Sequence, residues 1–159
     1  MSPWSHPTTI PPGPMTRDLA PRPGVTLVEG GADVAVYAGH ADAVELCLFD
    51  AGDKAGTSER RIPLLERAHG WWFAFVPGIT AGQRYNFRAH GAWSPDQGLR
   101  HNPAKLLLDP YAKAIEGPIL WERGRTLAYA DGDDIVMDET DSAAAIPKSV
   151  VVDESFDWE

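Results

Sequence analysis

The sequence of 159 residues contains a single cysteine, Cys47, and lacks several features that mark other classes of protein. One cysteine excludes an internal disulfide bond and any zinc site built from cysteines. The longest apolar runs, such as Leu106–Leu108 and Ala143–Ile146, are far shorter than the roughly 20 residues of a membrane-spanning helix. Acidic residues number 23 against 14 basic ones, and this net charge of −9 argues against nucleic acid or an anionic membrane as a partner.

Motifs that carry chemistry are also missing. The sequence has no Gly-x-Ser-x-Gly elbow and no glycine-rich phosphate loop, and its five histidines lack the spacing of metal ligands. The run that starts at Asp131 resembles a calcium loop, but its twelfth residue is Ser142 instead of glutamate. Cys47 stands between two leucines, which favours a structural role. We therefore predict no catalytic residue, no metal and no cofactor. No signal peptide opens the sequence, so we expect a cytoplasmic protein.

The composition divides the chain into three regions. Residues 1–24 hold seven of the 14 prolines, which predicts a disordered leader. Residues 131–159 carry ten acidic residues and one base, Lys148, so they account for the whole net charge of −9. Because large apolar residues such as Ile146 and Val150–Val152 are interspersed there, this end is expected to lie against another surface. A mobile tail is the alternative.

Residues 25–115 show the pattern of an all-β protein. Apolar residues alternate with polar ones in five segments, separated by turn residues about every ten positions. These segments are 34–36, 44–48, 61–64, 71–76 and 84–89. The length and the pattern predict an immunoglobulin-like antiparallel β-sandwich, in which Pro63 marks an edge strand.

The pattern changes after Gly91. A polar, turn-rich stretch leads to three leucines, Leu106–Leu108, between Pro103 and Pro110. This composition predicts an extended apolar strap that crosses a surface. Because Asp109 is a good N-cap and proline favours the first helical position, we expect one short helical turn through residues 111–114.

Six tryptophans are present, and two of them are adjacent. On a strand, Trp71 and Trp72 point to opposite faces, so at most one of them belongs to the core. The other offers a flat ring on which a sugar could stack, unless it packs against a loop or another domain. Arg84, Asn86 and Arg88 are expected on the polar face of a neighbouring strand, either toward sugar hydroxyls or in solvent.

Five runs resemble the N-terminal region of bacterial glycogen-debranching enzymes of the isoamylase type, in glycoside hydrolase family 13. They are Ala32–Asp50 (ADVAVYAGHADAVELCLFD), Gly70–Val76, Gly82–Gly91 (GQRYNFRAHG), Trp93–Lys113 (WSPDQGLRHNPAKLLLDPYAK) and Ser142–Trp158, which includes PKSVVVDESFDW. The resemblance implies a sandwich of carbohydrate-binding module family 48, followed in the whole enzyme by a (β/α)8 barrel. It also implies hydrolysis of α-1,6 branches by a catalytic trio of two aspartates and one glutamate in that barrel. One carboxylate acts as nucleophile and another as acid/base, and none of the three is assignable in this chain.

The resemblance implies a non-catalytic accessory domain that supports the barrel and its α-glucan substrate, glycogen or maltodextrin. Residues 116–159 would then be a linker into the barrel. An autonomous α-glucan-binding module that uses Trp72 or Trp93 is one alternative, and a purely structural scaffold is another. The strap would supply the interface with the barrel, through Asn102, Pro103, Lys105, Leu106, Leu107, Leu108, Asp109, Pro110 and Tyr111. Because that interface would otherwise be exposed, we expect the chain to self-associate or to leave its last thirty residues disordered.

Overall fold

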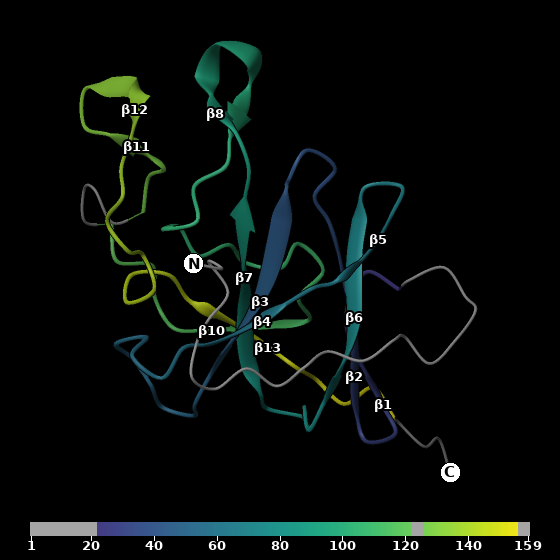
Figure 1. Cartoon of the computed structure of the whole chain (residues 1–159). Coiled ribbons are helices and arrows are strands. Elements are labelled where there is room, and N and C mark those ends of the chain that lie inside the picture. Colours follow the sequence, from purple (N-terminus) through teal and green to yellow (C-terminus); the bar gives the residue numbers. More distant parts are fainter. Residues whose placement is uncertain (1–21, 122–125, 156–159) are drawn as a thin grey trace.

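A computed structural model describes residues 22–121 and 126–155, so most of the expected leader lies outside the described residues. Two antiparallel sheets pack face to face (Figure 1). The first has the strand order β1-β2-β6-β5. Its strands are β1 (Gly24–Val28), β2 (Gly31–Tyr37), β5 (Glu66–Ala68) and β6 (Trp71–Pro77). Within the described ranges the only helical element is the short turn η1 (Pro95–Gln97), and no helix is long and apolar enough to cross a membrane.

The second sheet has five strands in the order β10-β13-β7-β3-β4. Its strands are β3 (Ala43–Phe49), β4 (Arg60–Pro63), β7 (Arg84–His90), β10 (Ala114–Glu116) and β13 (Lys148–Val150). The predicted all-β sandwich is thus confirmed, and β4, which contains Pro63, lies at an edge as proline requires.

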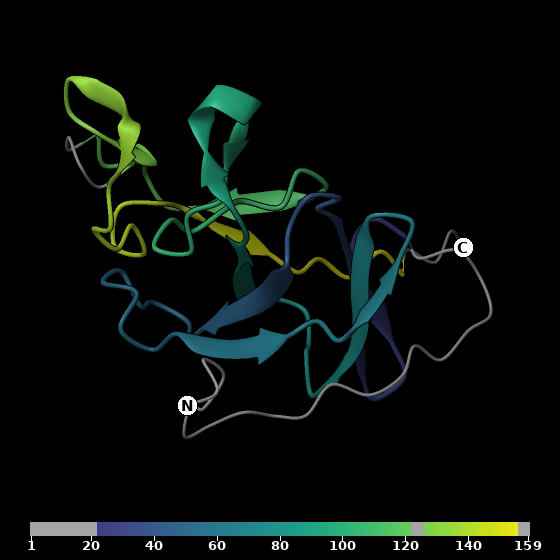
Figure 2. The ribbon, with the colours of Figure 1, turned by 45° about the horizontal axis from the view of Figure 1, so that its top comes forward.

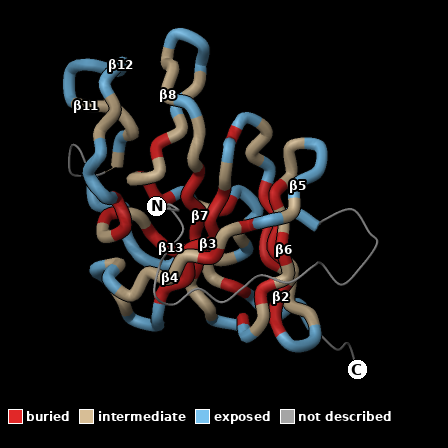
Figure 3. The backbone as a smooth tube through the Cα atoms, in the orientation of Figure 1, coloured by how far each residue is buried: buried red, intermediate tan, exposed pale blue. Residues whose placement is uncertain are grey.

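Between the sheets lies one apolar core. It is built from alternate residues of facing strands, such as Val34 and Val36 of β2 and Leu46 and Leu48 of β3. Figure 3 shows this buried band in red between the sheets, with exposed segments at the loop ends. Period-two alternation forms such a core because successive side chains of a strand point to opposite faces.

A second, smaller core covers the outer face of the five-stranded sheet. Cys47 and Phe49 of β3 point away from the main core and pack with Leu106 of the strap and Ala143. Leu107 extends the edge of β7, since its backbone N–H and C=O each form a 2.8 Å hydrogen bond with Phe87. The strap does cross a surface, as the sequence predicted, and that surface is a sheet of the same chain.

The end of the chain also joins this sheet. β13 pairs with β7 through Ser149↔Tyr85 and with β10 through Ile115↔Ser149, and Val151 is buried in the main core. Residues expected to form a linker therefore contribute a strand to the sandwich. The disordered alternative for the last thirty residues is wrong for residues 130–155, whereas residues 156–159 lie outside the described ranges.

Two hairpins project from one end of the sandwich. The first consists of β8 (Trp93–Ser94), η1 and β9 (Leu99–Arg100), and the second of β11 (Tyr129–Ala130) and β12 (Asp133–Met137). Figures 1 and 2 show them side by side, away from both sheets. The helical turn expected after Asp109 is instead a simple turn, in which the Asp109 carboxylate accepts a 2.8 Å hydrogen bond from the Tyr111 N–H, and β10 follows.

Candidate functional site

Trp72 lies in the main core. The residue is only 7% exposed, its indole Nε1 donates a 3.0 Å hydrogen bond to the Ala38 carbonyl, and the Arg67 guanidinium lies 4.8 Å from the ring centroid. With one side of the residue in the core and the other under Arg67, Trp72 does not offer the sugar platform that the sequence suggested. Its neighbour Trp71 is the one on the outer face.

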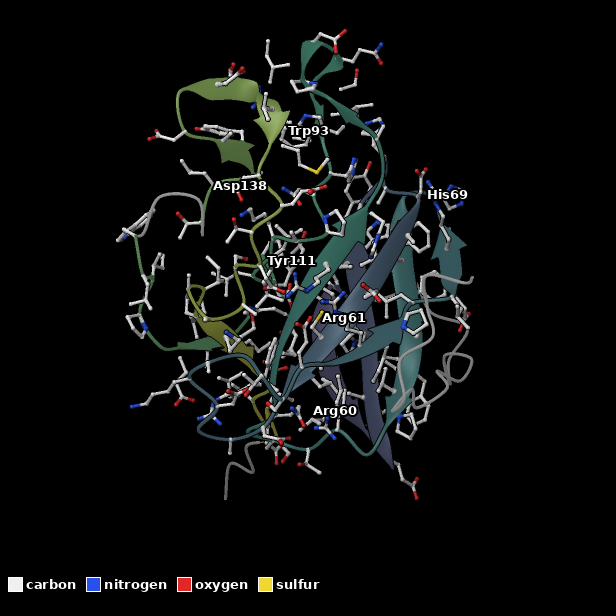
Figure 4. All side chains as sticks on the ribbon, turned by 60° about the vertical axis from the view of Figure 1, so that its left-hand side comes forward. Arg60, Arg61, His69, Trp93, Tyr111 and Asp138 are labelled. Atoms are coloured by element: carbon white, nitrogen blue, oxygen red, sulfur yellow. The ribbon has the colours of Figure 1, made fainter. Side chains whose placement is uncertain are left out.

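Trp93 lies between the two projecting hairpins (Figure 4). Its Nε1 donates a 2.6 Å hydrogen bond to the carbonyl of Ile135 on β12, and the residue is half-buried. Arg100 strengthens the same junction, because its guanidinium donates to the Asp134 carbonyl at 2.9 Å and lies 5.6 Å from the ring centroid of Tyr129. Trp93 thus ties the hairpins together, and its role in sugar binding stays a prediction.

An aromatic cluster that no sequence motif predicted lies on the outer face of the four-stranded sheet. Tyr37 at the end of β2 meets Trp71 edge to face, with ring centroids 5.7 Å apart. Tyr111 of the strap lies beside Trp71, at 6.3 Å between centroids. Tyr37 is 59% exposed and Tyr111 is 49% exposed, so this cluster presents aromatic surface to solvent.

The polar residues of the strap are buried and bonded within this chain. The Asn102 amide donates to the carbonyls of Ala128 and Asp138 at 3.0 and 2.7 Å. The Lys105 ammonium donates to the Thr140 carbonyl at 2.7 Å and pairs with the Asp138 carboxylate at 3.2 Å. These bonds fasten the strap to the residues on either side of the β11–β12 hairpin, and a role of the strap in an interface with another domain stays a prediction.

Asp109 anchors the other end of the strap. Its carboxylate accepts a 2.7 Å hydrogen bond from the Tyr85 hydroxyl, in a buried position. Burial, together with this bond to a carboxylate, raises the pKa of Tyr85 far above its ordinary value, so Tyr85 remains a neutral donor. The Asp109 backbone N–H in turn donates to the Ser149 hydroxyl of β13 at 3.2 Å, so strap and strand hold one another.

Arg88 is the centre of a buried ion network. Its side chain is fully buried, and Nε and Nη2 donate to the two carboxylate oxygens of Glu59 at 2.6 and 2.9 Å. Nη2 also reaches Asp141 at 3.0 Å, and Nη1 donates to the strap carbonyl of Pro103 at 2.8 Å. Burial by itself opposes the ionisation of Glu59 and Asp141, but hydrogen bonds lower the pKa of both: from Arg88 to Glu59, and from the Ala143 N–H and then Arg88 to Asp141.

Two of the three polar residues of β7 fit neither expectation, and the first is Arg88, which is fully buried in its ion network. Asn86 donates to the Pro147 carbonyl at 2.8 Å and accepts from the Ser149 N–H at 3.0 Å, so it faces neither sugar nor solvent. Arg84 is the more accessible member and pairs with Glu116 of β10 at 2.5 Å.

A pocket of about 310 Å³ opens beside β13. Arg84, Leu120, Pro147 and Lys148 are among its lining residues. The Lys148 ammonium is satisfied by the carbonyls of Ala143 and Ile146 at 2.6 and 2.7 Å, and burial lowers its pKa. Among the described residues, no group of three or more His, Cys, Asp or Glu side chains is arranged to hold a metal ion.

The comparisons with known proteins agree with this architecture. Residues 23–112 match the model of the carbohydrate-binding module 48 family, the isoamylase N-terminal domain. The chain belongs to this family. The matched range begins just before β1 and ends just after the strap, so it spans Trp93 and the Asn102–Tyr111 run.

Several relatives are much longer proteins. The module is 42% identical over 145 residues to the glycogen debranching enzyme of Serratia proteamaculans. The alignment covers 91% of this chain and 21% of that enzyme. It is 41% identical to the glycogen debranching enzyme of Salmonella typhi, over 86% of this chain and 19% of that enzyme. The chain thus spans about a fifth of the length of these relatives.

Solved structures share the fold at low sequence identity. The pneumococcal glycogen-degrading virulence factor SpuA matches with a TM-score of 0.53 and 23% identity, over 85% of this chain and 12% of that one. Pullulanase from Bacillus acidopullulyticus matches with a TM-score of 0.51 and 17% identity, over 85% of this chain and 12% of that chain. At these identities the likeness concerns the fold of the module alone.

The sequence thus predicted the module and its strap, but not the aromatic cluster on the surface of the module. Alternation along the strands placed Trp71 and Trp72 on opposite faces without telling which face is the core. Tyr111 was expected only as part of an interface with the barrel, and Tyr37 carried no signal, because each of them reaches Trp71 only after folding.

Proposed function

We propose that this module is the non-catalytic accessory domain of a glycogen-debranching α-1,6-glucosidase of the isoamylase type. The observation that carries the proposal is its 42% identity, over 91% of its own length, to a fifth of a glycogen debranching enzyme. In this role the module supports a catalytic barrel and helps to hold an α-glucan chain of glycogen or maltodextrin. A cytoplasmic location belongs to the same proposal.

The bonding of three acidic residues supports a non-catalytic role for the module. Glu45 is bonded to His90 at 2.9 Å, Glu59 to Arg88 at 2.6 Å, and Asp109 to Tyr85 at 2.7 Å. Glycoside hydrolysis by the retaining route uses two carboxylates that flank one scissile bond. Each of these three carboxylates instead holds a structural partner, which supports a function in assembly rather than in bond cleavage.

The surface that supports docking of a catalytic domain is apolar and lies partly in the strap. Leu107 is 45% exposed and Pro110 is also exposed, while Pro103 and Leu108 are half-buried. Beyond the strap, exposed apolar residues continue through the segment after β10, where Leu120 is 42% and Trp121 is 77% exposed. Runs of exposed apolar residues on this scale mark interaction surfaces, and self-association of the isolated module through them is part of this proposal.

A chimera tests the proposal. The region of the Serratia proteamaculans enzyme that matches this chain is replaced by the chain, and the debranching of glycogen is measured. We expect the chimera to retain most of the parent activity and a deletion of the region to lose it. An inactive chimera whose module is folded, as judged by circular dichroism, would contradict an accessory role.

Two matched variants locate the docking surface in the chimera. Leu120→Asp places a charge in the proposed interface, where it would be desolvated, so activity and thermal stability should fall. Leu65→Asp is the control, because Leu65 is 67% exposed and precedes β5, outside the proposed interface. Equal losses in both variants would show that Leu120 does not contact the catalytic domain.

A further inference from the structure

The aromatic cluster of Tyr37, Trp71 and Tyr111 is assembled from three segments. Tyr37 and Trp71 are register partners at the ends of β2 and β6, and Tyr111 reaches them from the turn that ends the strap. Because Trp72 points into the core, Trp71 points away from it. The cluster therefore lies on the opposite side of the sandwich from the sheet that the strap covers.

Tyr37 and Tyr111 are exposed and Trp71 is half-buried, and close contacts hold Tyr37 in place. A Cβ atom at Gly39 would lie 2.7 Å from the Tyr37 hydroxyl oxygen, and one at Gly70 would lie 2.6 Å from Tyr37 Cε2. Tyr37 thus rests on two glycines, and Gly70 also has a φ of +83° that other residues rarely adopt. The edge contact with Trp71 adds a second constraint. Rings that are ordered before a ligand arrives lose little conformational entropy on binding.

We propose that Tyr37, Trp71 and Tyr111 form a binding site for an α-glucan chain, whose pyranose rings stack on the aromatic rings. The inference rests on the proposed function and names where the module holds the glucan. A pyranose ring presents C–H groups on its faces and hydroxyls around its edge. The faces match exposed aromatic rings, and the tyrosine hydroxyls are polar groups at the edge of the same surface.

The angles between the rings favour an α-glucan over a β-glucan. The Tyr37 and Trp71 planes are inclined by 71°, and the Trp71 and Tyr111 planes by 41°. A β-1,4-linked glucan is a straight ribbon and stacks on coplanar rings. An α-1,4-linked glucan turns at each linkage, so successive sugar rings face different directions, as the rings of this cluster do.

The test is a titration of the full chain with maltoheptaose, followed by the indole Nε1–H signals in two-dimensional NMR and assigned with single Trp→Phe variants. We expect a saturable shift of the Trp71 signal at millimolar sugar and none for Trp72. Tyr37→Ala and Tyr111→Ala should each weaken binding about tenfold, since each removes one stacked ring. Ile135→Ala truncates an exposed apolar residue of β12 and should leave the affinity unchanged.

Several results would overturn the inference. They are unchanged affinity in both tyrosine variants with native-like spectra, shifts confined to Trp93, no binding at all, or equally tight binding of cellohexaose. The chimera separates this inference from the accessory role. An inactive chimera with intact binding at Trp71 contradicts the accessory role alone, and an active chimera without such binding contradicts the glucan site alone.

Discussion

Arg88 shows how one residue can join distant parts of the chain. Its guanidinium contacts Glu59 before β4, Pro103 in the strap and Asp141 after β12. Removing a guanidinium from water costs several kcal/mol, and only complete pairing offsets that cost. Because its partners come from three segments, Arg88 stabilises the sandwich only when all three are in place.

Replacing Arg88 by alanine should lower the free energy of unfolding by about 3–5 kcal/mol, because Glu59 would be left buried without its main partner. Urea denaturation measures the change. Arg60→Ala is the matched control, since Arg60 pairs with Asp50 at the surface and its loss should cost less than about 1 kcal/mol. Similar losses in both variants would show that the buried network adds no stability.

At the scale of elements, the strap covers part of the outer face of the five-stranded sheet and extends one of its strands. It contributes Leu106 to the second core, extends the edge of β7 at Leu107, and carries Asn102, Lys105 and Asp109 as polar anchors. The residues that looked most like an interdomain interface are thus divided. The polar anchors and Leu106 hold the module itself together, whereas Leu107 and Pro110 remain exposed, and their contact with another domain stays a prediction.

Two neighbouring leucines test the strap. Leu106→Ala opens a cavity beside Cys47 and Phe49 and should cost about 2–5 kcal/mol of unfolding free energy. Leu107→Ala, at a residue that is 45% exposed, should cost less than about 1 kcal/mol. The fully buried Cys47 thiol provides a second readout, because a thiol reagent should label it faster in Leu106→Ala than in Leu107→Ala. Equal labelling rates would mean that Leu106 does not close this core.

At the scale of the whole molecule, the stability of the fold depends on the ionisation of some of its acidic residues. Glu59 and Asp141 both have a pKa below the ordinary value, Glu59 chiefly because of Arg88 and Asp141 through the Ala143 N–H and Arg88. A carboxyl whose pKa is lower in the folded state than in the unfolded state contributes stability above its unfolded pKa. That contribution is lost as the pH falls through the folded value.

We therefore expect the urea midpoint of the chain to fall as the pH is lowered from neutrality into the range in which these carboxyls take up protons. In Glu59→Gln this pH dependence should be shallower, because residue 59 no longer takes up a proton on unfolding. Glu29→Gln removes the same charge from an exposed turn and should leave the slope unchanged. Parallel slopes in all three proteins would exclude Glu59 as a source of the acid sensitivity.

The sequence predicted the four seven-residue strands and the edge strand β4, and it missed β10 and β13. β2, β3, β6 and β7 each have seven residues, enough for alternation to stand out from composition. β10 and β13 have three residues each, and their place in the sheet depends on pairing with β7 and with each other. The segment that looked like a linker was thus assigned to the sandwich only by tertiary pairing.

The sequence by itself determined an all-β sandwich, an apolar strap and membership in the carbohydrate-binding module 48 family, because period-two alternation and a contiguous motif are local properties. Tertiary structure decided that Trp72 is buried in the core and that Trp71 lies half-buried on the outer face, and that the strap closes on its own sheet. It also brought Tyr37, Trp71 and Tyr111 together. The physical reason is that alternation gives each strand two faces, whereas only the packing of the sheets selects which face loses its water.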